Sequence, residues 1–260
     1  MGRLLFITGA SSGIGQALAA HAYALGWDLA MVARREAQLQ HWAETSRLDP
    51  ARYRVYPGDV ADVASIVAAA RACLNQQGVP DVVIASAGIS IGMDTAARED
   101  LDVMAQTLAV NNVGLAATFH PFIEPMRQRG AGRLVGIASV AGIRGLPGHG
   151  AYCASKAGVI SYCESLRGEL RGSGVRVVTL SPGYVDTPMT QQNRYAMPFM
   201  ISPQAFAARA WPAIESGVRH KVIPWPMAVV ARLLRWLPDP LFDSLLAGRP
   251  RKHRATGKQP

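Results

Sequence analysis

Cysteine is scarce in this chain, and its placement excludes two common uses of the residue. The three cysteines, Cys73, Cys153 and Cys163, contain no Cys-x-x-Cys pair. An odd number without such pairs argues against a disulfide scaffold and favours a reducing compartment, so we expect a cytoplasmic protein. The histidines show no metal-ligand spacing either, and the sequence therefore predicts no metal site.

Long hydrophobic runs are also missing. A membrane-spanning helix needs about 18 or more consecutive apolar residues, and the chain has no such run. The first apolar run, residues 4–8, is too short and wrongly flanked for a secretory signal. We expect a soluble protein, with peripheral membrane contact as the less favoured alternative.

Acidic residues are fewer than basic ones, and the excess of positive charge is unevenly distributed along the chain. Lysine and arginine number 27 against 18 acids, which gives a formal net charge of +9. Five of these cations, and no acid, lie in residues 249–260. A short basic segment without interleaved aromatic residues forms no structured basic face, so nucleic acid is not an expected partner. We expect residues 249–260 to be a disordered tail.

Short apolar runs alternate with longer helical patterns over most of the chain. The expected strands are residues 4–8, 28–33, 52–56, 81–86, 133–139, 175–180 and 221–223. The expected helices are residues 14–25, 36–47, 63–77, 101–129 and 152–171, with Pro121 and Pro125 expected to kink or divide the fourth. This order predicts an α/β fold with a doubly wound parallel sheet (Rossmann-like) of about seven strands, in a single domain over residues 1–248.

The pattern changes after residue 182. Residues 184–202 are rich in methionine and aromatic side chains, which suit an adaptable apolar substrate pocket or simply pack on the body of the protein. His149, three residues before Tyr152 in a glycine-rich stretch, could line the substrate pocket or occupy a solvated loop. Ser202-Pro203 should begin another helix. Residues 225–247 form an amphipathic segment that fits either a membrane interface or, as we prefer, packing on the protein or a partner subunit.

A glycine-rich turn joins the first expected strand to the first expected helix. Its sequence is Thr8-Gly9-Ala10-Ser11-Ser12-Gly13-Ile14-Gly15. Glycines let the backbone approach a phosphate closely, and the helix that follows offers free N–H groups. The GxxxGxG spacing differs from the usual GxGxxG, and a plain structural turn is the alternative. The position between strand and helix favours dinucleotide binding by Gly9, Ser11, Ser12, Gly13, Ile14 and Gly15.

Two arginines follow the second expected strand. An acid at this position would bind a ribose 2′-hydroxyl and favour NAD, whereas Arg34 and Arg35 would accommodate a 2′-phosphate. A solvated basic pair at a helix start is the alternative. The sequence predicts NADP(H), with NAD(H) less favoured.

The next two strand ends also carry candidate cofactor residues. Asp59-Val60 could contact an adenine edge, although Asp59 could equally cap the following helix. Ser86-Ala87-Gly88 closes the fourth strand with small residues that permit close passage of a cofactor.

A tyrosine and a lysine four residues apart carry the candidate chemistry. Tyr152 and Lys156 should project from one helix face, where an ammonium lowers the pKa of a phenol. Such a tyrosine can exchange a proton with a carbonyl oxygen. Tyr-x-x-x-Lys alone is common by chance. Ser139, at the end of the fifth expected strand, strengthens the interpretation because its hydroxyl can bind the same oxygen.

Taken together, these motifs resemble the short-chain dehydrogenase/reductase family. The matching pieces run in family order over about residues 3–190: TGASSGIG at 8–15, Asp59-Val60, Ala87-Gly88, Asn111 in Val-Asn-Asn-Val-Gly, Ser139, Tyr152 with Lys156, and Ser181-Pro182-Gly183. One departure is Ser86, where the family usually has asparagine; local rigidity could fall, but no catalytic group is lost.

The resemblance implies roles for individual residues. Tyr152 is expected to be the general acid/base, Lys156 to lower its pKa and bind the nicotinamide ribose, and Ser139 to orient the carbonyl. Asn111, in preference to Asn112, is expected to hold a water that links Lys156 to solvent. The residues expected near the nicotinamide are Pro182, Gly183, Val185 and Thr187, with residues 184–202 forming a substrate lid.

The expected function is that of an NADP(H)-dependent oxidoreductase that interconverts a carbonyl and a secondary alcohol on a small, apolar molecule. The resemblance also implies a homodimer or homotetramer joined through the helices after the fourth and fifth strands. Two alternatives are a non-catalytic NADP(H)-binding regulatory protein and a peripheral-membrane reductase of lipid ketones.

Overall fold

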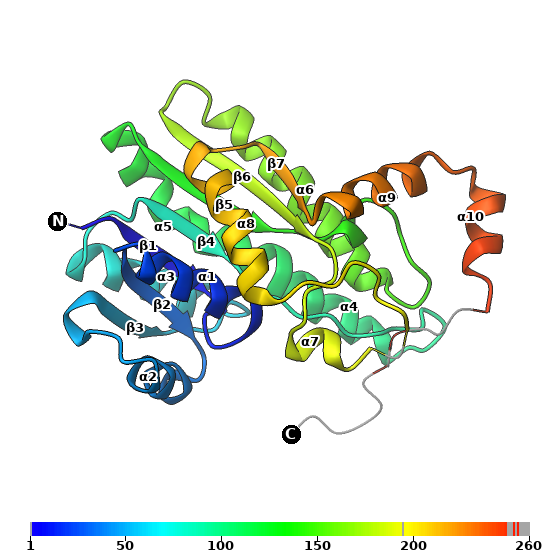
Figure 1. Ribbon diagram of the computed structural model, residues 1–260, viewed down its shortest axis with the longest axis horizontal. Coiled ribbons are helices and arrows are strands. Elements are labelled where there is room, and N and C mark those ends of the chain that lie inside the picture. The colour runs from blue at the N-terminus through cyan, green and yellow to red at the C-terminus, as the bar shows by residue number, and fades with distance from the viewer. Residues whose placement is uncertain (1, 194, 249–251, 253, 255–260) are drawn as a thin grey trace.

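Seven parallel strands form one twisted sheet in the order β3-β2-β1-β4-β5-β6-β7 (Figure 1). The computed structural model describes residues 2–193, 195–248, 252 and 254. The strands are β1 (Leu4–Thr8), β2 (Asp28–Ala33), β3 (Tyr53–Pro57), β4 (Val82–Ala85), β5 (Gly132–Ile137), β6 (Val175–Pro182) and β7 (His220–Ile223). The strand order reverses between β1 and β4, which confirms the expected doubly wound α/β sheet.

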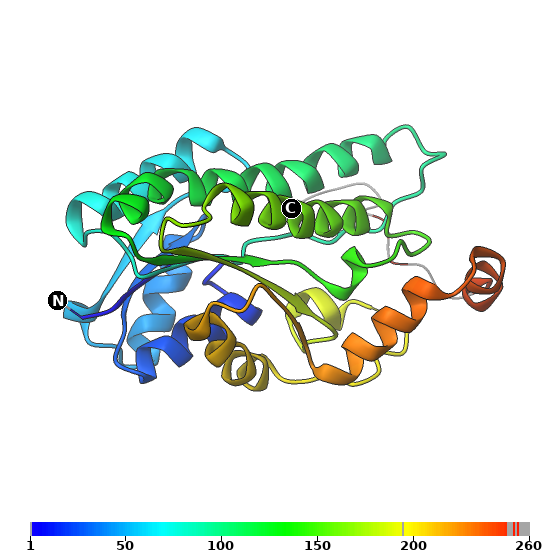
Figure 2. The same ribbon diagram turned by 90° about the horizontal axis from the view of Figure 1, so that it is seen from above.

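Helices cover both faces of the sheet (Figure 2). They are α1 (Gly13–Ala24), α2 (Glu36–Thr45), α3 (Val63–Gln76), α4 (Asp100–Leu108), α5 (Gly114–Arg129), α6 (Gly150–Glu169), α7 (Pro188–Gln191), α8 (Pro203–Ser216), α9 (Trp225–Trp236) and α10 (Asp239–Leu246). Helices α1, α2 and α8 lie on one face, and α3, α5 and α6 lie on the other.

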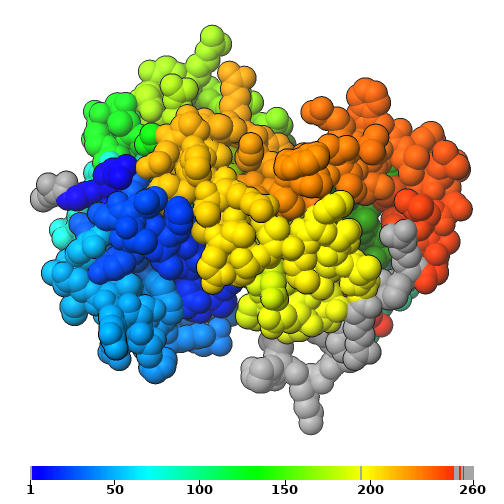
Figure 3. Space-filling model, viewed as in Figure 1, coloured from blue at the N-terminus to red at the C-terminus, as the bar shows by residue number. Residues whose placement is uncertain are grey.

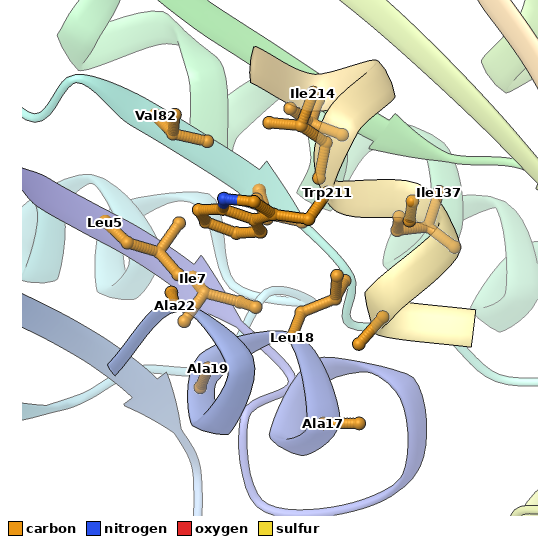
Figure 4. Packing of buried hydrophobic residues seen from close by; sticks show 14 of the residues in the cluster. Leu5, Ile7, Ala17, Leu18, Ala19, Ala22, Val82, Ile137, Trp211 and Ile214 are labelled. Atoms are coloured by element: carbon orange, nitrogen blue, oxygen red, sulfur yellow. The ribbon is translucent and has the colours of Figure 1, made fainter. Parts of the chain in front are cut away.

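Alternate side chains of β1 enter two separate cores. Leu5 and Ile7 join the core that contains Trp211 of α8 (Figure 4), whereas Phe6 points to the opposite face and packs against Phe122 of α5. Trp211 also meets Trp27 edge to face at 5.2 Å. Because both faces of the strand are buried, β1 is apolar from Leu4 to Ile7, which is why the sequence shows a continuous rather than an alternating apolar run.

The helix expected at residues 101–129 is interrupted before its prolines and not at them. A π-helical turn, Ala109–Val113, separates α4 from α5, and α5 then continues through Pro121 and Pro125. The expected division at the prolines is therefore wrong. Phe119, Phe122 and Met126 of α5 are buried against the sheet, and this packing holds the helix together where a proline has no N–H to donate.

The end of the chain extends the structure beyond the sheet. Pro238 separates the segment expected at residues 225–247 into α9 and α10, which lie at one end of the molecule (Figure 1). No helix in the described ranges is long and apolar enough to cross a membrane. Of the tail expected to be disordered, only Lys252 and Arg254 belong to the described residues, and the rest lies outside them.

Candidate active site

A cavity of about 690 Å³ opens at the carboxyl ends of the central strands. This edge, where the strand order reverses between β1 and β4, is where open α/β sheets bind ligands. All the predicted cofactor residues line the cavity: Gly9, Ser11, Ser12, Gly13, Ile14, Gly15, Arg34, Arg35, Asp59, Val60, Ser86, Ala87, Gly88, Tyr152, Lys156, Pro182, Gly183, Val185 and Thr187. Ser139 lines it too, whereas Asn111 does not.

The glycine-rich turn leaves no space for side chains. A Cβ on Gly15 would lie 2.3 Å from the carbonyl oxygen of Gly9, and one on Gly9 would lie 2.8 Å from the backbone of Ala87. Gly9 and Gly13 also adopt positive φ angles of 67° and 56°. The exposed backbone leads directly into α1, so the turn and the cavity fit a dinucleotide whose pyrophosphate binds at the helix N-terminus.

The ends of β2 and β3 form the opposite part of the cavity. The Arg34 side chain is 70% exposed there, and its nearest acidic oxygen, from Asp59, is 4.0 Å away. The Asp59 carboxylate accepts a hydrogen bond from the Ala61 amide, whereas α3 is capped by Asp62. Asp59 was expected either to contact the adenine or to cap the following helix. The second role belongs to Asp62 instead.

Ser139, Tyr152 and Lys156 meet beside the cavity. Ser139, just after β5, lies close enough to Tyr152, in the first turn of α6, for its hydroxyl to lower the pKa of the phenol. Lys156 follows one turn later, and its side chain is buried with Nζ 5.7 Å from the Tyr152 ring centre. The Lys156 Nζ donates a hydrogen bond of 2.8 Å to the Ile137 carbonyl. The structure thus brings together the three residues that the sequence singled out.

Burial sets the protonation of this group. It raises the pKa of Tyr152, and the Ser139 hydroxyl lowers that pKa in part. Burial also lowers the pKa of Lys156 from 10.5 to about 8. We expected the lysine charge to lower the pKa of Tyr152, but in the protein alone desolvation is the larger effect and the direction is upward. Tyr152 therefore holds its proton near neutral pH.

Asn111 lies in the π-helical turn and joins two walls of the site. Its side chain is 1% exposed; Oδ1 accepts a hydrogen bond from the Ile89 amide at 2.8 Å, and Nδ2 donates to the Ile89 carbonyl and to the Ser155 hydroxyl. Through these hydrogen bonds, the side-chain amide of Asn111 connects the loop after β4 to α6. Sequence reasoning missed Ile89 and Ser155 because the contacts are separated by 22 and 44 residues.

The expected lid is anchored at both ends. Val185 pairs with Ile201, so the segment between them leaves and rejoins the body at one place. Within it, the Tyr195 hydroxyl lies 3.2 Å from Nε2 of His149, and the His149 ring is buried rather than solvated. The Tyr184 ring packs edge to face on Tyr195. These aromatic contacts beside α6 were not apparent from the sequence.

Comparisons with known proteins agree with this geometry. The family model for the short chain dehydrogenase matches residues 3–197. An "Uncharacterized oxidoreductase" of Myxococcus xanthus is 36% identical over 242 residues, which cover 93% of this chain and 95% of the relative. The chain belongs to the short-chain dehydrogenase family. It is accordingly an oxidoreductase that acts on alcohol or carbonyl groups and binds a nicotinamide cofactor.

Solved members of the family share the fold with different cofactors. A short-chain dehydrogenase/reductase from Burkholderia phymatum in complex with NAD has a TM-score of 0.81 at 25% identity, over 98% of both chains. An alcohol dehydrogenase from Thermococcus sibiricus complexed with 5-hydroxy-NADP has a TM-score of 0.74 at 24% identity, over 85% of this chain and 94% of that one. The fold therefore accommodates either dinucleotide, and local residues must decide between them.

Proposed function

We propose that this protein is an NADP(H)-dependent oxidoreductase that interconverts a carbonyl and a secondary alcohol on an apolar molecule. The observation that carries the proposal is that Ser139, Tyr152 and the buried Lys156 line the same cavity, with the Ser139 hydroxyl next to the Tyr152 phenol. Two hydroxyls directed at one region can both bind a single carbonyl oxygen. The methionine and aromatic side chains of residues 184–202 favour an apolar substrate.

Each of the three side chains has a defined part in reduction. A nicotinamide held beside Pro182, Gly183 and Val185 would supply the hydride that the carbonyl carbon needs. Tyr152, whose pKa is raised by burial, donates its proton to the carbonyl oxygen, and Ser139 holds that oxygen in place by hydrogen bonding. Lys156, with a pKa of about 8, stabilises the phenolate that remains and can return a proton to it. Alcohol oxidation follows the same steps in reverse.

Arg34 supports the choice of NADP(H). Its guanidinium is exposed at the cavity rim, and the 4.0 Å separation from Asp59 leaves its hydrogen-bonding groups available to a ribose 2′-phosphate. Fluorescence titration should show tighter binding of NADPH than of NADH, and Arg34→Asp should remove the difference. Arg54→Asp, on the exposed side of β3 outside the cavity, is the matched control. Equal affinities in the parent protein would contradict the proposal.

The acid/base assignment is tested by removing one hydroxyl. Tyr152→Phe should abolish NADPH-dependent reduction across a panel of apolar ketones while NADPH still binds. Tyr162→Phe removes a phenol from the same helix away from the cavity and should leave reduction intact. Retained turnover in Tyr152→Phe would refute the assignment. A parent protein that binds NADPH but reduces none of the ketones, at any pH, would favour the non-catalytic binding protein.

A further inference from the structure

One face of α9 is apolar and exposed. Trp225, Val229, Leu233 and Trp236 follow one another at intervals of four, four and three residues, which places them along a single stripe of the helix. All four side chains are exposed, and the two tryptophans are exposed by 74% and 83%. We call these four residues the α9 stripe.

The stripe is not needed to attach α9 to the body of the protein. The opposite face of the helix does this through Met227 and Ala231, which are buried. α9 is thus apolar on two faces, one packed and one open. Exposed tryptophan and leucine side chains gathered on one element are unfavourable in water and mark an interaction surface.

The neighbouring helix extends the exposed apolar surface. Leu241 and Leu245 of α10 are exposed, one turn apart, while Phe242 between them is buried beneath the guanidinium of Arg144 at 3.8 Å. Arg144 also donates hydrogen bonds to the carbonyls of Leu234 and Leu237 at the end of α9. α10 is therefore held in place with apolar side chains directed outward, at the same end of the molecule as α9 (Figure 3).

The charges around the stripe are mainly positive. Arg232 and Arg235 are exposed on α9, and neither makes an ion pair within the part of the chain that the structure describes. α9 contains no acid, and of the two acids on α10, Asp239 is already paired with Arg144. The two arginines beside the stripe favour an anionic partner.

We propose that the α9 stripe docks on the surface of a membrane that contains anionic phospholipids. Tryptophan prefers the boundary between headgroups and acyl chains, and arginine beside it attracts the phosphates. A second copy of the chain fits less well. In a two-fold contact through the stripe, the positive patch that contains Arg232 and Arg235 would meet the same positive patch of the other copy.

The position of α9 connects this surface to the cavity. Met227, on its buried face, packs against Gly183, where an added Cβ would lie 2.6 Å from the Met227 Cγ. Gly183 lines the cavity. A carbonyl compound dissolved in the bilayer would thus be presented within about one helix diameter (about 10 Å) of the site. This consequence rests on the proposed function, whereas the docking itself does not.

Vesicle co-sedimentation tests the docking without any turnover. The full-length protein is sedimented with phosphatidylcholine vesicles and with vesicles in which part of the lipid is phosphatidylglycerol. Leu233→Ser combined with Trp236→Ser should weaken partitioning about tenfold or more, and Arg232→Glu should weaken it about fivefold on anionic vesicles only. Leu25→Ser and Arg171→Glu, exposed at the opposite edge of the sheet, are the matched controls and should partition like the parent.

The alternatives give different results. A parent protein that sediments with neither kind of vesicle overturns the proposal, and so does equal partitioning of the parent and all the variants. If sedimentation velocity shows a dimer that the Leu233→Ser, Trp236→Ser variant dissociates, and no vesicle binding, the stripe is an interface between copies and the proposal is wrong. Because no step needs catalysis, failure here is separate from failure of the reductase assignment.

Discussion

Replacing Lys156 by methionine should make the protein more stable at neutral pH. The ammonium is buried beside Tyr152, and burial lowers its pKa from 10.5 to about 8. Since one pKa unit corresponds to about 1.4 kcal/mol, keeping this lysine charged in the folded state costs about 3 kcal/mol. Methionine loses the hydrogen bond to the Ile137 carbonyl, which reduces the gain by about 1 kcal/mol. The expected net gain near pH 7 is about 2 kcal/mol.

The gain should depend on pH in a defined direction. Between pH 8 and pH 10.5 the unfolded chain still holds the Lys156 proton that the folded chain has lost. The free energy of unfolding of the parent therefore rises with pH through this window. The amount by which it falls short of the variant's is constant only below the pKa of Lys156 in the folded protein. The methionine variant lacks this dependence, so its advantage over the parent should shrink as the pH is raised from 7 to 10.

Urea denaturation of both proteins without added cofactor, at a series of pH values, measures the difference directly. Groups that titrate in both proteins cancel in the comparison. Lys221→Met removes an exposed ammonium from β7 and is the matched control, for which we expect a difference from the parent that stays constant with pH. A Lys156→Met difference that is equally constant between pH 7 and pH 10 would refute the argument that burial destabilises the lysine charge.

Three further substitutions test the core and the site. Trp211→Ala should lower the free energy of unfolding by about 3–5 kcal/mol in urea denaturation, because it leaves a cavity in place of a buried indole. Gly15→Ala should abolish dinucleotide binding in a fluorescence titration, since its Cβ would meet the Gly9 carbonyl at 2.3 Å. Asn111→Ala should cost about 2–4 kcal/mol of stability and lower kcat, because both backbone groups of Ile89 lose their partner. Parent-like stability of Trp211→Ala would contradict the first expectation, and parent-like dinucleotide affinity of Gly15→Ala the second. Parent-like stability and kcat of Asn111→Ala would contradict the third.

The fold could be predicted because its signals are local. β1 is apolar from Leu4 to Ile7 since it is buried on both faces, and Gly26 and Gly130 mark turns where φ is positive. The sequence-based predictions fail where contacts between residues far apart in the chain determine the local structure. α5 passes through Pro121 because the aromatic side chains around it are buried against the sheet, and no property of the proline itself shows this.

The site divides in the same way. The glycine-rich turn, Tyr152 and Lys156 are contiguous motifs, and the structure brings them to one cavity with Ser139. The contacts of His149 with Tyr195 join segments 46 residues apart, so no spacing rule could reveal them. The amphipathic pattern of α9 was ambiguous for another reason. Both of its faces are apolar, and only the structure shows that one packs on the body while the other is open.

In the loop after β4, residues distant in the sequence provide the hydrogen bonds that a local side chain would otherwise make. Where the family usually has asparagine, this chain has Ser86, and a hydroxyl offers fewer hydrogen bonds than an amide. The Thr8 hydroxyl accepts hydrogen bonds from the backbone amides of Ser86 and Ala87, at 3.2 and 3.3 Å. Asn111 holds both backbone groups of Ile89 two residues later. Rigidity at this turn therefore comes from β1 and the π-helical turn.

The same loop is fixed farther along by the end of the chain. Arg254 pairs with Asp100, whose carboxylate also accepts a hydrogen bond from the Asp94 amide at 2.6 Å, and Lys252 donates one to the Ser90 hydroxyl. The arginine and this backbone bond hold the pKa of Asp100 below its usual range. Ile89 and Ile91 of this loop line the cavity. The basic residues near the end of the chain thus brace one wall of the active site, and part of the chain's positive charge acts within the protein itself.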